Sequence, residues 1–430
     1  MDTEKRSPVT AIIVGCGHRS LFYGQYALEH PEDMKIVGVA DPDPVRRKMA
    51  KDRFSLPDGM LFVSSEELCA RPRLADAIIN GTMDRQHVPT SVPLLDLGYH
   101  MLLEKPFACD EDELKIIDEA VKRNRSRVMI CHVLRYTPFY HSIKEHIAAG
   151  EIGDVISIQT NEYVSYDHIA TCYVRGKWGN SDKCGTSMLL AKCCHDLDLM
   201  MWMAGDDEPV ALSSFGGLKQ FTKENAPEGC GTKCLVDCPY VDTCVFSAKS
   251  MYLDHPDRWK FYVWSALEGI EDPTDEDRVA LLKSDASYGK CVYRLDNNVV
   301  DRQTVSVRFR SGAVGVHCMI GGSSRAARTI KIVGTRGEIY GGFEDNRYRI
   351  LKINTAPGKE YDVYDYDLND AEVSRGHGGG DMEMCRDFVE YVRTGKESLA
   401  CPSVERSVPA YLAVFEADRV MNSSVSTLDL

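Results

Sequence analysis

Residues 9–20, Val9-Thr-Ala-Ile-Ile-Val-Gly-Cys-Gly-His-Arg-Ser20, decide the fold of this chain. The apolar run 9–14 is typical of a strand that is covered on both faces, as in a parallel sheet. We expect Gly15 to make the tight turn after this strand and Gly17 to let the backbone approach a pyrophosphate. The helix that opens near Ser20, just after His18 and Arg19, would then present free N–H groups to the phosphates, and His18 and Arg19 are expected to join the cofactor site. The stretch therefore predicts a dinucleotide-binding turn.

A second strand at residues 35–40 ends at Asp41. A carboxylate at this place accepts hydrogen bonds from the ribose hydroxyls and repels a 2′-phosphate, which favours NAD over NADP. Arg46 and Arg47 follow closely and could neutralise that repulsion, or they belong to a solvated helix face. Ser20 departs from the usual pattern, because it stands where a third glycine normally allows close packing.

Three further strands are expected at residues 76–80, 99–103 and 127–131, alternating with helical segments. This βαβ series predicts an α/β Rossmann domain, a doubly wound parallel sheet, over residues 1–150. Lys105, in Glu104-Lys105-Pro106, follows the strand at 99–103. Ligands collect at the carboxyl ends of parallel strands, so we expect Lys105 beside a nicotinamide.

Residues 151–430 are expected to form an α+β substrate domain. Strand patterns recur there without regular helices between them, which is typical of an open, mostly antiparallel sheet. They lie at residues 155–159, 303–310, 313–320, 329–333 and 338–340. A final helix at 404–420 is expected to pack back on the first domain.

The strongest chemical signal of this second part is the segment 188–202, for which the sequence predicts one largely buried helix. Lys192, His195 and Asp198 are spaced three residues apart and would share one stripe of it. Burying charge is costly unless the group is paired or used. The three residues therefore indicate either a satisfied structural network, with Asp198 paired to the backbone and His195 to Asp198, or a catalytic site.

Substrate contacts are expected from the segment 162–178. His168, Tyr173, Arg175 and Trp178 offer hydrogen bonds and a flat apolar face suited to a pyranose or cyclitol ring, although each could equally be an ordinary loop residue. His377, which glycines follow, could reach the site from a mobile loop.

Four cysteines, Cys230, Cys234, Cys238 and Cys244, lie in an inserted loop rich in Gly, Pro and Asp. Their thiolates could hold a structural zinc ion or an iron–sulfur cluster. The spacing lacks the paired C-x-x-C units that make zinc assignments strong, so reduced thiols or occasional disulfides are the alternative. In every case the loop is expected to lie apart from the chemistry.

Composition indicates a cytoplasmic enzyme. The net charge of −14 argues against nucleic acid and against an anionic membrane as partners, because both require a basic face. We find neither a signal peptide nor an apolar run long enough to cross a bilayer. Sixteen scattered cysteines are typical of reduced thiols in the cytoplasm.

Over nearly its whole length the chain resembles the glucose-fructose oxidoreductase / inositol dehydrogenase / MocA family. The resemblance rests on motifs that occur in the family's order: Gly15-x-Gly17, Asp41, Thr82, His87, Glu104-Lys105-Pro106, Arg135-Tyr136-x-Pro138, Gly185, His195-x-x-Asp198 and His377-Gly-Gly-Gly-Asp381. It implies that Thr82, His87 and Glu104 join the cofactor site, and that Arg135 and Asp198 join the substrate site. It also implies a homo-oligomer built through the C-terminal sheet.

The resemblance implies an NAD(P)-dependent oxidoreductase that acts on a secondary alcohol of a sugar, a sugar derivative or a cyclitol. His195 would be the base, Lys105 would stabilise alkoxide character, and Lys192 would assist the proton transfer or anchor the substrate. The family usually has a carboxylate four residues before the histidine, where this chain has Ala191.

Two other functions stay open. Because the usual carboxylate is missing, the chain could be a glycoside-cleaving lyase that uses NAD for transient oxidation followed by elimination. It could also be a non-enzymatic NAD or sugar sensor, although the presence of both Lys105 and His195 argues against this.

Overall fold

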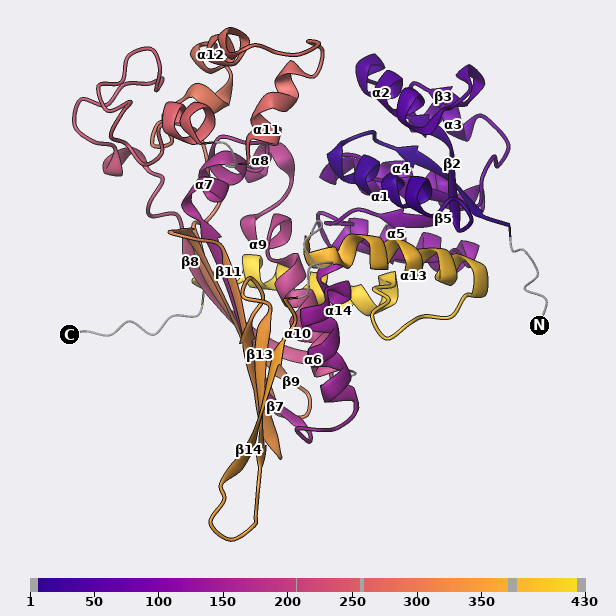
Figure 1. The fold of residues 1–430 in the computed structure, drawn as a ribbon, viewed down its shortest axis with the longest axis vertical. Coiled ribbons are helices and arrows are strands. Elements are labelled where there is room, and N and C mark those ends of the chain that lie inside the picture. Colours follow the sequence, from indigo (N-terminus) through magenta and orange to yellow (C-terminus); the bar gives the residue numbers. More distant parts are fainter. Residues whose placement is uncertain (1–6, 206, 256–258, 370–376, 424–430) are drawn as a thin grey trace. The chain divides into compact units, whose positions relative to one another are not determined.

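The computed structural model describes residues 7–205, 207–255, 259–369 and 377–423. The chain divides into two compact units (Figure 1). The first comprises Met1–Glu151, Met201–Gly205 and Asp365–Leu412, and the second Ile152–Met200, Asp206–Tyr364 and Ala413–Leu430. The segments 201–205 and 365–412, which the sequence analysis placed with the second domain, thus belong to the first unit.

The first unit is built on a six-stranded sheet with the order β3-β2-β1-β4-β5-β6, and its strands pair in parallel. The strands are β1 Val9–Val14, β2 Met34–Ala40, β3 Leu61–Phe62, β4 Ala77–Asn80, β5 His100–Leu103 and β6 Val128–Ile130. β1, β4, β5 and β6 are almost entirely buried, as expected for strands with helices on both faces. The predicted Rossmann sheet is confirmed.

The helices of this unit are α1 His18–Glu29, α2 Pro44–Phe54, α3 Ser65–Cys69, α4 His87–Asp96, α5 Glu111–Asn124, α6 Pro138–Ala148 and α13 Gly380–Thr394. Local signals fix their starts: the side chains of Asp43, Ser64 and Asp110 cap α2, α3 and α5. α13 comes from the far end of the chain and packs beside α1 (Figure 1), where the Cys385 thiol lies 3.8 Å from the Tyr23 carbonyl oxygen.

The second unit is built on an eight-stranded sheet with the order β14-β13-β12-β11-β7-β10-β9-β8. Its strands are β7 Val155–Ser165, β8 Pro209–Gly217, β9 Arg302–Phe309, β10 Val314–Ser323, β11 Ala327–Gly334, β12 Gly337–Gly342, β13 Arg347–Ile353 and β14 Tyr361–Asp367. β7 and β10 pair in parallel, whereas β8–β9, β9–β10, β7–β11, β11–β12 and β12–β13 pair antiparallel. The mostly antiparallel sheet is therefore confirmed.

Short helices accompany this sheet: α7 Tyr166–His168, α8 Ser181–Cys184, α9 Met188–Ala191, the first part of α10 Cys194–Ala204, α11 Lys260–Trp264, α12 Asp275–Lys283 and the second half of α14 Val404–Arg419. A π-helical turn, Ile169–Val174, follows α7. Such turns interrupt regular helices and often occur at functional sites. The predicted helix 188–202 is wrong in one respect, because it is broken between α9 and α10.

Candidate functional site

The glycine turn after β1 has the shape that the sequence predicts. Gly15 has a φ of +83°, and a Cβ built on it would lie 2.8 Å from the Gly81 carbonyl oxygen, so no other residue fits there. Gly17 is the N-cap of α1, and no described atom lies within 4 Å of a Cβ built on it. No side chain of the described residues caps this helix end, so its first N–H groups point to a site where phosphate oxygens fit.

The serine at the third glycine position has a specific neighbour. Ser20 is fully buried, and a Cβ built on Gly81, just after β4, would lie only 1.9 Å from its hydroxyl oxygen. The third glycine normally lets the helix pack closely against the sheet. Here Gly81 has no side chain and so leaves room for Ser20. The departure at Ser20 therefore leaves the turn intact.

Asp41 follows β2, as expected, and is buried beside the glycine turn. Its carboxylate accepts hydrogen bonds from the Cys16 N–H at 2.7 Å and the Asp43 N–H at 2.8 Å. Arg47 donates to the Asp41 carbonyl oxygen. Burial and the Asp41 charge raise the pKa of the Cys16 thiol to about 12, so this thiol stays neutral. The role of Asp41 toward a ribose stays a prediction.

Glu104 is the centre of a buried ionic network. Its carboxylate accepts hydrogen bonds from the Tyr23 hydroxyl at 2.6 Å, the Lys105 N–H at 2.8 Å and Arg19 Nε at 3.3 Å. Arg19 also pairs with Asp381 of α13. Burial opposes ionisation, but Arg19, Lys105 and the hydrogen bonds together hold the pKa of Glu104 below its ordinary value. Glu104 thereby fixes the backbone of Lys105, which follows β5.

His87 joins the loops after β4 and β5. Its Nδ1 lies 2.6 Å from the Pro106 carbonyl oxygen and its Nε2 lies 3.1 Å from the Thr82 carbonyl oxygen. The Thr82 hydroxyl donates to the side chain of Asn80 at 2.9 Å. Thr82 and His87 thus hold the loop after β4. In the sheet, β4 lies between β1, which the glycine turn follows, and β5, which Lys105 follows.

Arg135 and His18 occupy different environments. Arg135 is 1% exposed, and its guanidinium lies 5.5 Å from the centroid of the Trp202 ring within the first unit. Its contact with a substrate stays a prediction. His18 is exposed at the first turn of α1 and stacks on Phe22.

In the second unit, Lys192 lies in the break between α9 and α10, with a φ of −112°. Its Nζ is 3.2 Å from Glu162 Oε1, and both side chains are largely buried. Glu162 lies on β7, opposite Arg328 of β11, whose Nε is 2.6 Å from Glu162 Oε2 and 3.1 Å from Asp196 Oδ1. The expected regular stripe is therefore replaced by an ion network that links the helix break to the sheet.

A further trio lies next to this network. One ligand atom from each of Cys193, Asp196 and His317 lies within 4.8 Å of the others, and the three side chains are buried. Burial lowers the pKa of His317, whose Nδ1 lies 2.9 Å from the Thr160 hydroxyl. Arg328 already compensates the Asp196 charge, so the trio fits a neutral polar contact better than a divalent cation.

His195 and Asp198 lie on α10, three positions apart, and are 8% and 1% exposed. His195 is next to Asp196 in the chain and follows the helix break that Lys192 occupies. The ion network of Glu162 and Arg328 therefore explains in part why the buried segment 188–202 contains charged residues. The catalytic assignment of His195 stays a prediction.

Three of the expected substrate residues lie together. His168 stacks on Trp259 with ring centroids 3.7 Å apart, and Tyr173 stacks on Trp178 at 5.8 Å. Tyr262 meets the Trp178 ring edge to face at 5.9 Å. We call these five residues the aromatic cluster; Trp178, Trp259 and Tyr262 are half-buried and keep part of their rings accessible.

Arg175 is not part of the aromatic cluster. Its guanidinium is fully buried and donates to the Phe246 carbonyl oxygen at 2.7 Å, while Nε donates to the Lys290 carbonyl oxygen at 2.8 Å. This placement corrects the expectation that Arg175 meets a substrate. The side chain of His377 lies outside the described residues; only its backbone, at the start of a 3₁₀ turn before α13, is placed.

The sequence analysis missed Glu162, Arg328, Trp259 and Tyr262. Glu162 could have been found, because a charged residue at an inward position of an alternating strand is unusual. Arg328 carries the same signal on β11. Trp259 and Tyr262 lie far along the chain from Trp178, in a region without a motif, so only the structure connects them.

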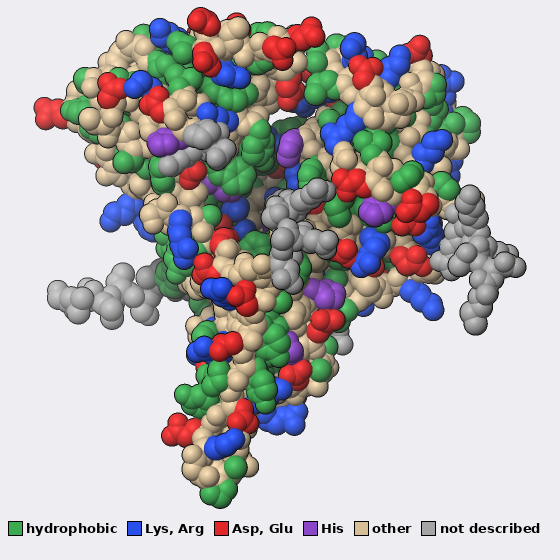
Figure 2. All heavy atoms as spheres, viewed as in Figure 1, with side chains coloured by type: hydrophobic (Ala, Val, Ile, Leu, Met, Phe, Trp, Pro, Cys, Tyr) green, Lys and Arg blue, Asp and Glu red, His purple; other side chains and the backbone are tan. Residues whose placement is uncertain are grey.

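Acidic and basic side chains are interspersed over the face shown in Figure 2. Among the helices of the described ranges, none combines the length and hydropathy needed to cross a bilayer.

Comparisons with known proteins agree with this geometry. Residues 9–132 match the family model described as "Oxidoreductase family, NAD-binding Rossmann fold", and residues 144–405 match its "C-terminal alpha/beta domain". YteT of Bacillus subtilis (strain 168) is 25% identical over 398 residues, which cover 87% of this chain and 88% of YteT. Inositol 2-dehydrogenase of Corynebacterium glutamicum (strain R) is 25% identical over 175 residues, 40% of this chain and 46% of that enzyme.

Among solved structures, UDP-N-acetylglucosamine 3-dehydrogenase GnnA from Acidithiobacillus ferrooxidans superposes with a TM-score of 0.63 at 15% identity. The superposition covers 97% of this chain and 99% of GnnA. At this identity the likeness establishes the shared fold.

Proposed function

Because the chain belongs to the glucose-fructose oxidoreductase / inositol dehydrogenase / MocA family of NAD-binding oxidoreductases, we propose that it oxidises a secondary alcohol of a sugar, sugar derivative or cyclitol. One observation carries the proposal. The glycine turn, Thr82 and Lys105 follow β1, β4 and β5, which are consecutive in one parallel sheet. A phosphate-binding turn and an amine thus lie along the sheet edge where such folds bind ligands.

The residues present fit a nicotinamide dinucleotide. The uncapped N-terminus of α1 and the open space at Gly17 suit the pyrophosphate, and Asp41 suits the ribose hydroxyls of NAD. When bound, the nicotinamide accepts the hydride of the alcohol carbon. NAD is preferred in this proposal because Asp41 opposes a 2′-phosphate. The cysteine insertion contributes no group to this reaction.

The chain's own residues handle the proton. We assign to His195 the removal of the hydroxyl proton of the substrate, and to the Lys105 ammonium the stabilisation of the negative charge that develops. Glu104 supports Lys105, because it accepts the Lys105 N–H and so orders the backbone from which the amine projects. Lys192 supplies a second cation, which Glu162 holds at 3.2 Å.

The aromatic cluster supports a carbohydrate or cyclitol as substrate. Its half-buried rings offer flat apolar faces to the C–H bonds of a sugar ring, while Lys177 Nζ lies 4.2 Å from the Trp178 centroid and adds a donor. Aromatic side chains are suited to this contact because their flat apolar faces pack against the C–H bonds on one face of the sugar ring. The hydroxyl that reacts is set by the groups around the ring.

A second candidate is an NAD-dependent lyase that oxidises a glycoside transiently and then eliminates the aglycone. It is favoured by Ala191, which stands where the family usually has a carboxylate. A non-enzymatic NAD or sugar sensor is the third function that the experiment must address.

The test is a screen of the purified chain with NAD against sugars, cyclitols and aryl glycosides. Both the absorbance of reduced cofactor and the released aglycone are measured, with Lys105→Met as the matched control. Net cofactor reduction that the control lacks supports the dehydrogenase. Aglycone release without net reduction supports the lyase, and binding without either product supports the sensor.

We further propose a cytoplasmic homo-oligomer. Phe215, Val314 and Ile320 are exposed apolar side chains on β8 and β10, at outward positions of the second sheet. Their burial between two copies would remove apolar area from water. All sixteen cysteines are free thiols, which suits a reducing compartment. Sedimentation velocity of the chain and of Phe215→Lys tests the assembly.

A further inference from the structure

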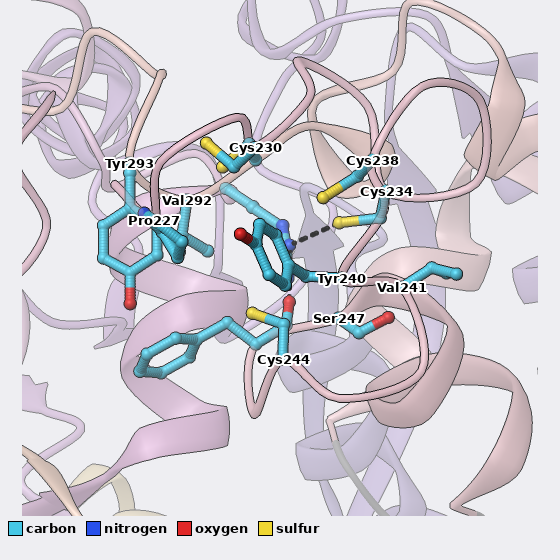
Figure 3. A pocket seen from close by; sticks show the side chains of 13 residues that line it. Pro227, Cys230, Cys234, Cys238, Tyr240, Val241, Cys244, Ser247, Val292 and Tyr293 are labelled. Carbon is cyan, nitrogen blue, oxygen red and sulfur yellow. Dashed lines mark hydrogen bonds between the residues drawn. The ribbon is translucent and has the colours of Figure 1, made fainter. Parts of the chain in front are cut away.

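A small cavity of the second unit gathers thiols from two segments of the chain. Among the described residues, four cysteines of the inserted loop and one from far along the chain line it: Cys230, Cys234, Cys238, Cys244 and Cys291 (Figure 3). Its volume of about 20 Å³ holds about one water molecule. The Arg175 guanidinium lies against one of the sulfurs, 3.4 Å from Cys234 Sγ. A space of this size, with a cation beside one sulfur, suits neither a zinc ion nor an iron–sulfur cluster.

Backbone pairing places Cys291 beside the inserted loop. The Cys291 N–H donates to the Thr232 carbonyl oxygen at 2.9 Å, and the Cys234 N–H donates to the Gly289 carbonyl oxygen at 2.9 Å. The two segments also form an antiparallel bridge between these bonds. The main chain therefore fixes where the Cys291 thiol lies.

The thiols of Cys230 and Cys291 are in direct contact, because their side chains share a hydrogen bond. Burial above all, together with this hydrogen bond, raises the pKa of the Cys291 thiol to about 11. Cys291 therefore keeps its proton at neutral pH and donates it to the Cys230 sulfur.

A guanidinium reaches the Cys230 sulfur as well. Arg294 Nε lies 3.4 Å from Cys230 Sγ, and Arg294 Nη2 lies 3.2 Å from the Cys230 carbonyl oxygen. A neighbouring guanidinium favours the thiolate, which is the form of cysteine that reacts with oxidants. Cys230 is 8% exposed, but Arg294 is an exposed residue, so the Cys230 sulfur lies one side chain away from solvent. Cys234, in contrast, faces Arg175, which is fully buried.

We propose that Cys230 is a site of oxidation by hydroperoxides and that Cys291 converts the product into a disulfide. In the first step the Cys230 thiolate attacks the peroxide: an S–O bond forms, the O–O bond breaks, and hydroxide or an alkoxide leaves a sulfenic acid behind. In the second step the Cys291 sulfur attacks the Cys230 sulfur: the S–S bond forms, the S–O bond breaks, and hydroxide leaves with the Cys291 proton as water. The two thiols together give two electrons to the peroxide.

The disulfide closes a long loop of the second unit, from residue 230 to residue 291. It ties the inserted loop to the segment whose Lys290 carbonyl oxygen accepts a hydrogen bond from Arg175 at 2.8 Å. Arg175 directly follows the π-helical turn that carries Tyr173 of the aromatic cluster. Because a closed loop restricts the unfolded chain, oxidation should raise the melting temperature.

The experiment uses the full chain, reduced, freed of reductant and then treated with hydrogen peroxide in an amount close to that of the chain. Remaining thiols are alkylated at intervals, and the chain is digested without reduction for mass spectrometry. We expect the disulfide between Cys230 and Cys291 to form first, with a loss of two hydrogens from the mass of the chain. Zinc and iron are quantified in the same sample, and the melting temperatures of the reduced and oxidised chains are compared.

Variants then assign the roles of the two sulfurs. Cys291→Ser should stop at a sulfenic acid on Cys230, which dimedone traps, and should show no rise in melting temperature. Cys230→Ser should give neither product. Cys238→Ser, which removes another thiol of the same cavity, is the matched control and should form the disulfide as the unmodified chain does. Arg294→Gln, at an exposed position, should slow the oxidation severalfold.

Several results would overturn the proposal. One is a first disulfide between other cysteines, and another is consumption of peroxide without the bond between Cys230 and Cys291. A metal ion that must be removed before these thiols react would overturn it too, as would an unchanged rate of oxidation in Arg294→Gln. The first measurement uses the unmodified chain, so it does not depend on whether a variant folds.

Discussion

Lys192 Nζ lies 3.2 Å from Glu162 Oε1, so the cation at the helix break is held by a carboxylate from the neighbouring sheet. Glu162 also binds Arg328, which in turn binds Asp196. Two carboxylates and two cations are thus buried together, with matching charge. This balance explains how so polar a segment can lie inside the second unit.

Glu162→Gln should destabilise the second unit, because it leaves Lys192 and Arg328 with Asp196 as their single anion in this network. Breaking a buried pair on one side typically costs about 3–5 kcal/mol. The measurement is the free energy of unfolding from chemical denaturation. Glu338→Gln is the matched control, since Glu338 pairs with Lys331 at a partly exposed site and surface pairs contribute roughly 0–1 kcal/mol. Equal effects of the two substitutions would contradict the network.

Gly81→Ala should damage the cofactor turn, because its Cβ would lie 1.9 Å from the Ser20 hydroxyl oxygen. We expect weaker NAD binding and a lower melting temperature, measured by titration and calorimetry. Ser20→Gly should be mild alone, about 1 kcal/mol for a glycine in a helix. The double variant should recover most of the affinity that Gly81→Ala loses. No recovery would show that Gly81 acts through something other than Ser20.

The Rossmann strands could be predicted because each is a short apolar run and the first ends in glycines that only a tight turn requires. The close packing of Ser20 against Gly81 could not be predicted, because the two residues are far apart in the sequence and no motif connects them. The antiparallel sheet was equally visible, because alternation and β-branched residues mark β9, β10 and β11 directly.

The second unit's site was harder to predict for physical reasons. Segment 188–202 has apolar residues on all sides, so its periodicity does not reveal that the helix is broken at Lys192. At this break, the Lys192 side chain contacts Glu162. The sequence predicts Arg175 as a substrate residue because it lies in the segment 162–178, whose side chains offer hydrogen bonds to a sugar ring. The burial of Arg175 follows from contacts with the Phe246 and Lys290 carbonyl oxygens, which lie far along the chain.

Asp41→Ser should shift cofactor preference toward NADP. The substitution removes the negative charge that opposes a 2′-phosphate, while Arg47 remains beside the Asp41 backbone. We expect weaker NAD binding and relatively tighter NADP binding, by about tenfold in the ratio of dissociation constants for each 1.4 kcal/mol of changed discrimination. Fluorescence titration with both cofactors measures it. A wild-type protein that binds NADP at least as tightly as NAD would refute the role of Asp41.

Lys105→Met and His195→Ala should each lower kcat by roughly 10² or more, the scale of losing a positioned acid or base, while NAD affinity stays nearly unchanged. Both residues are proposed to act on one proton transfer, so the double variant should be little slower than the slower single variant. Single-turnover rates with a substrate from the screen measure this. Lys177→Met, which removes an amine near Trp178, is the control and should raise KM more than it lowers kcat. Fully additive losses for Lys105 and His195, or near-normal turnover in either variant, would show that they serve separate steps.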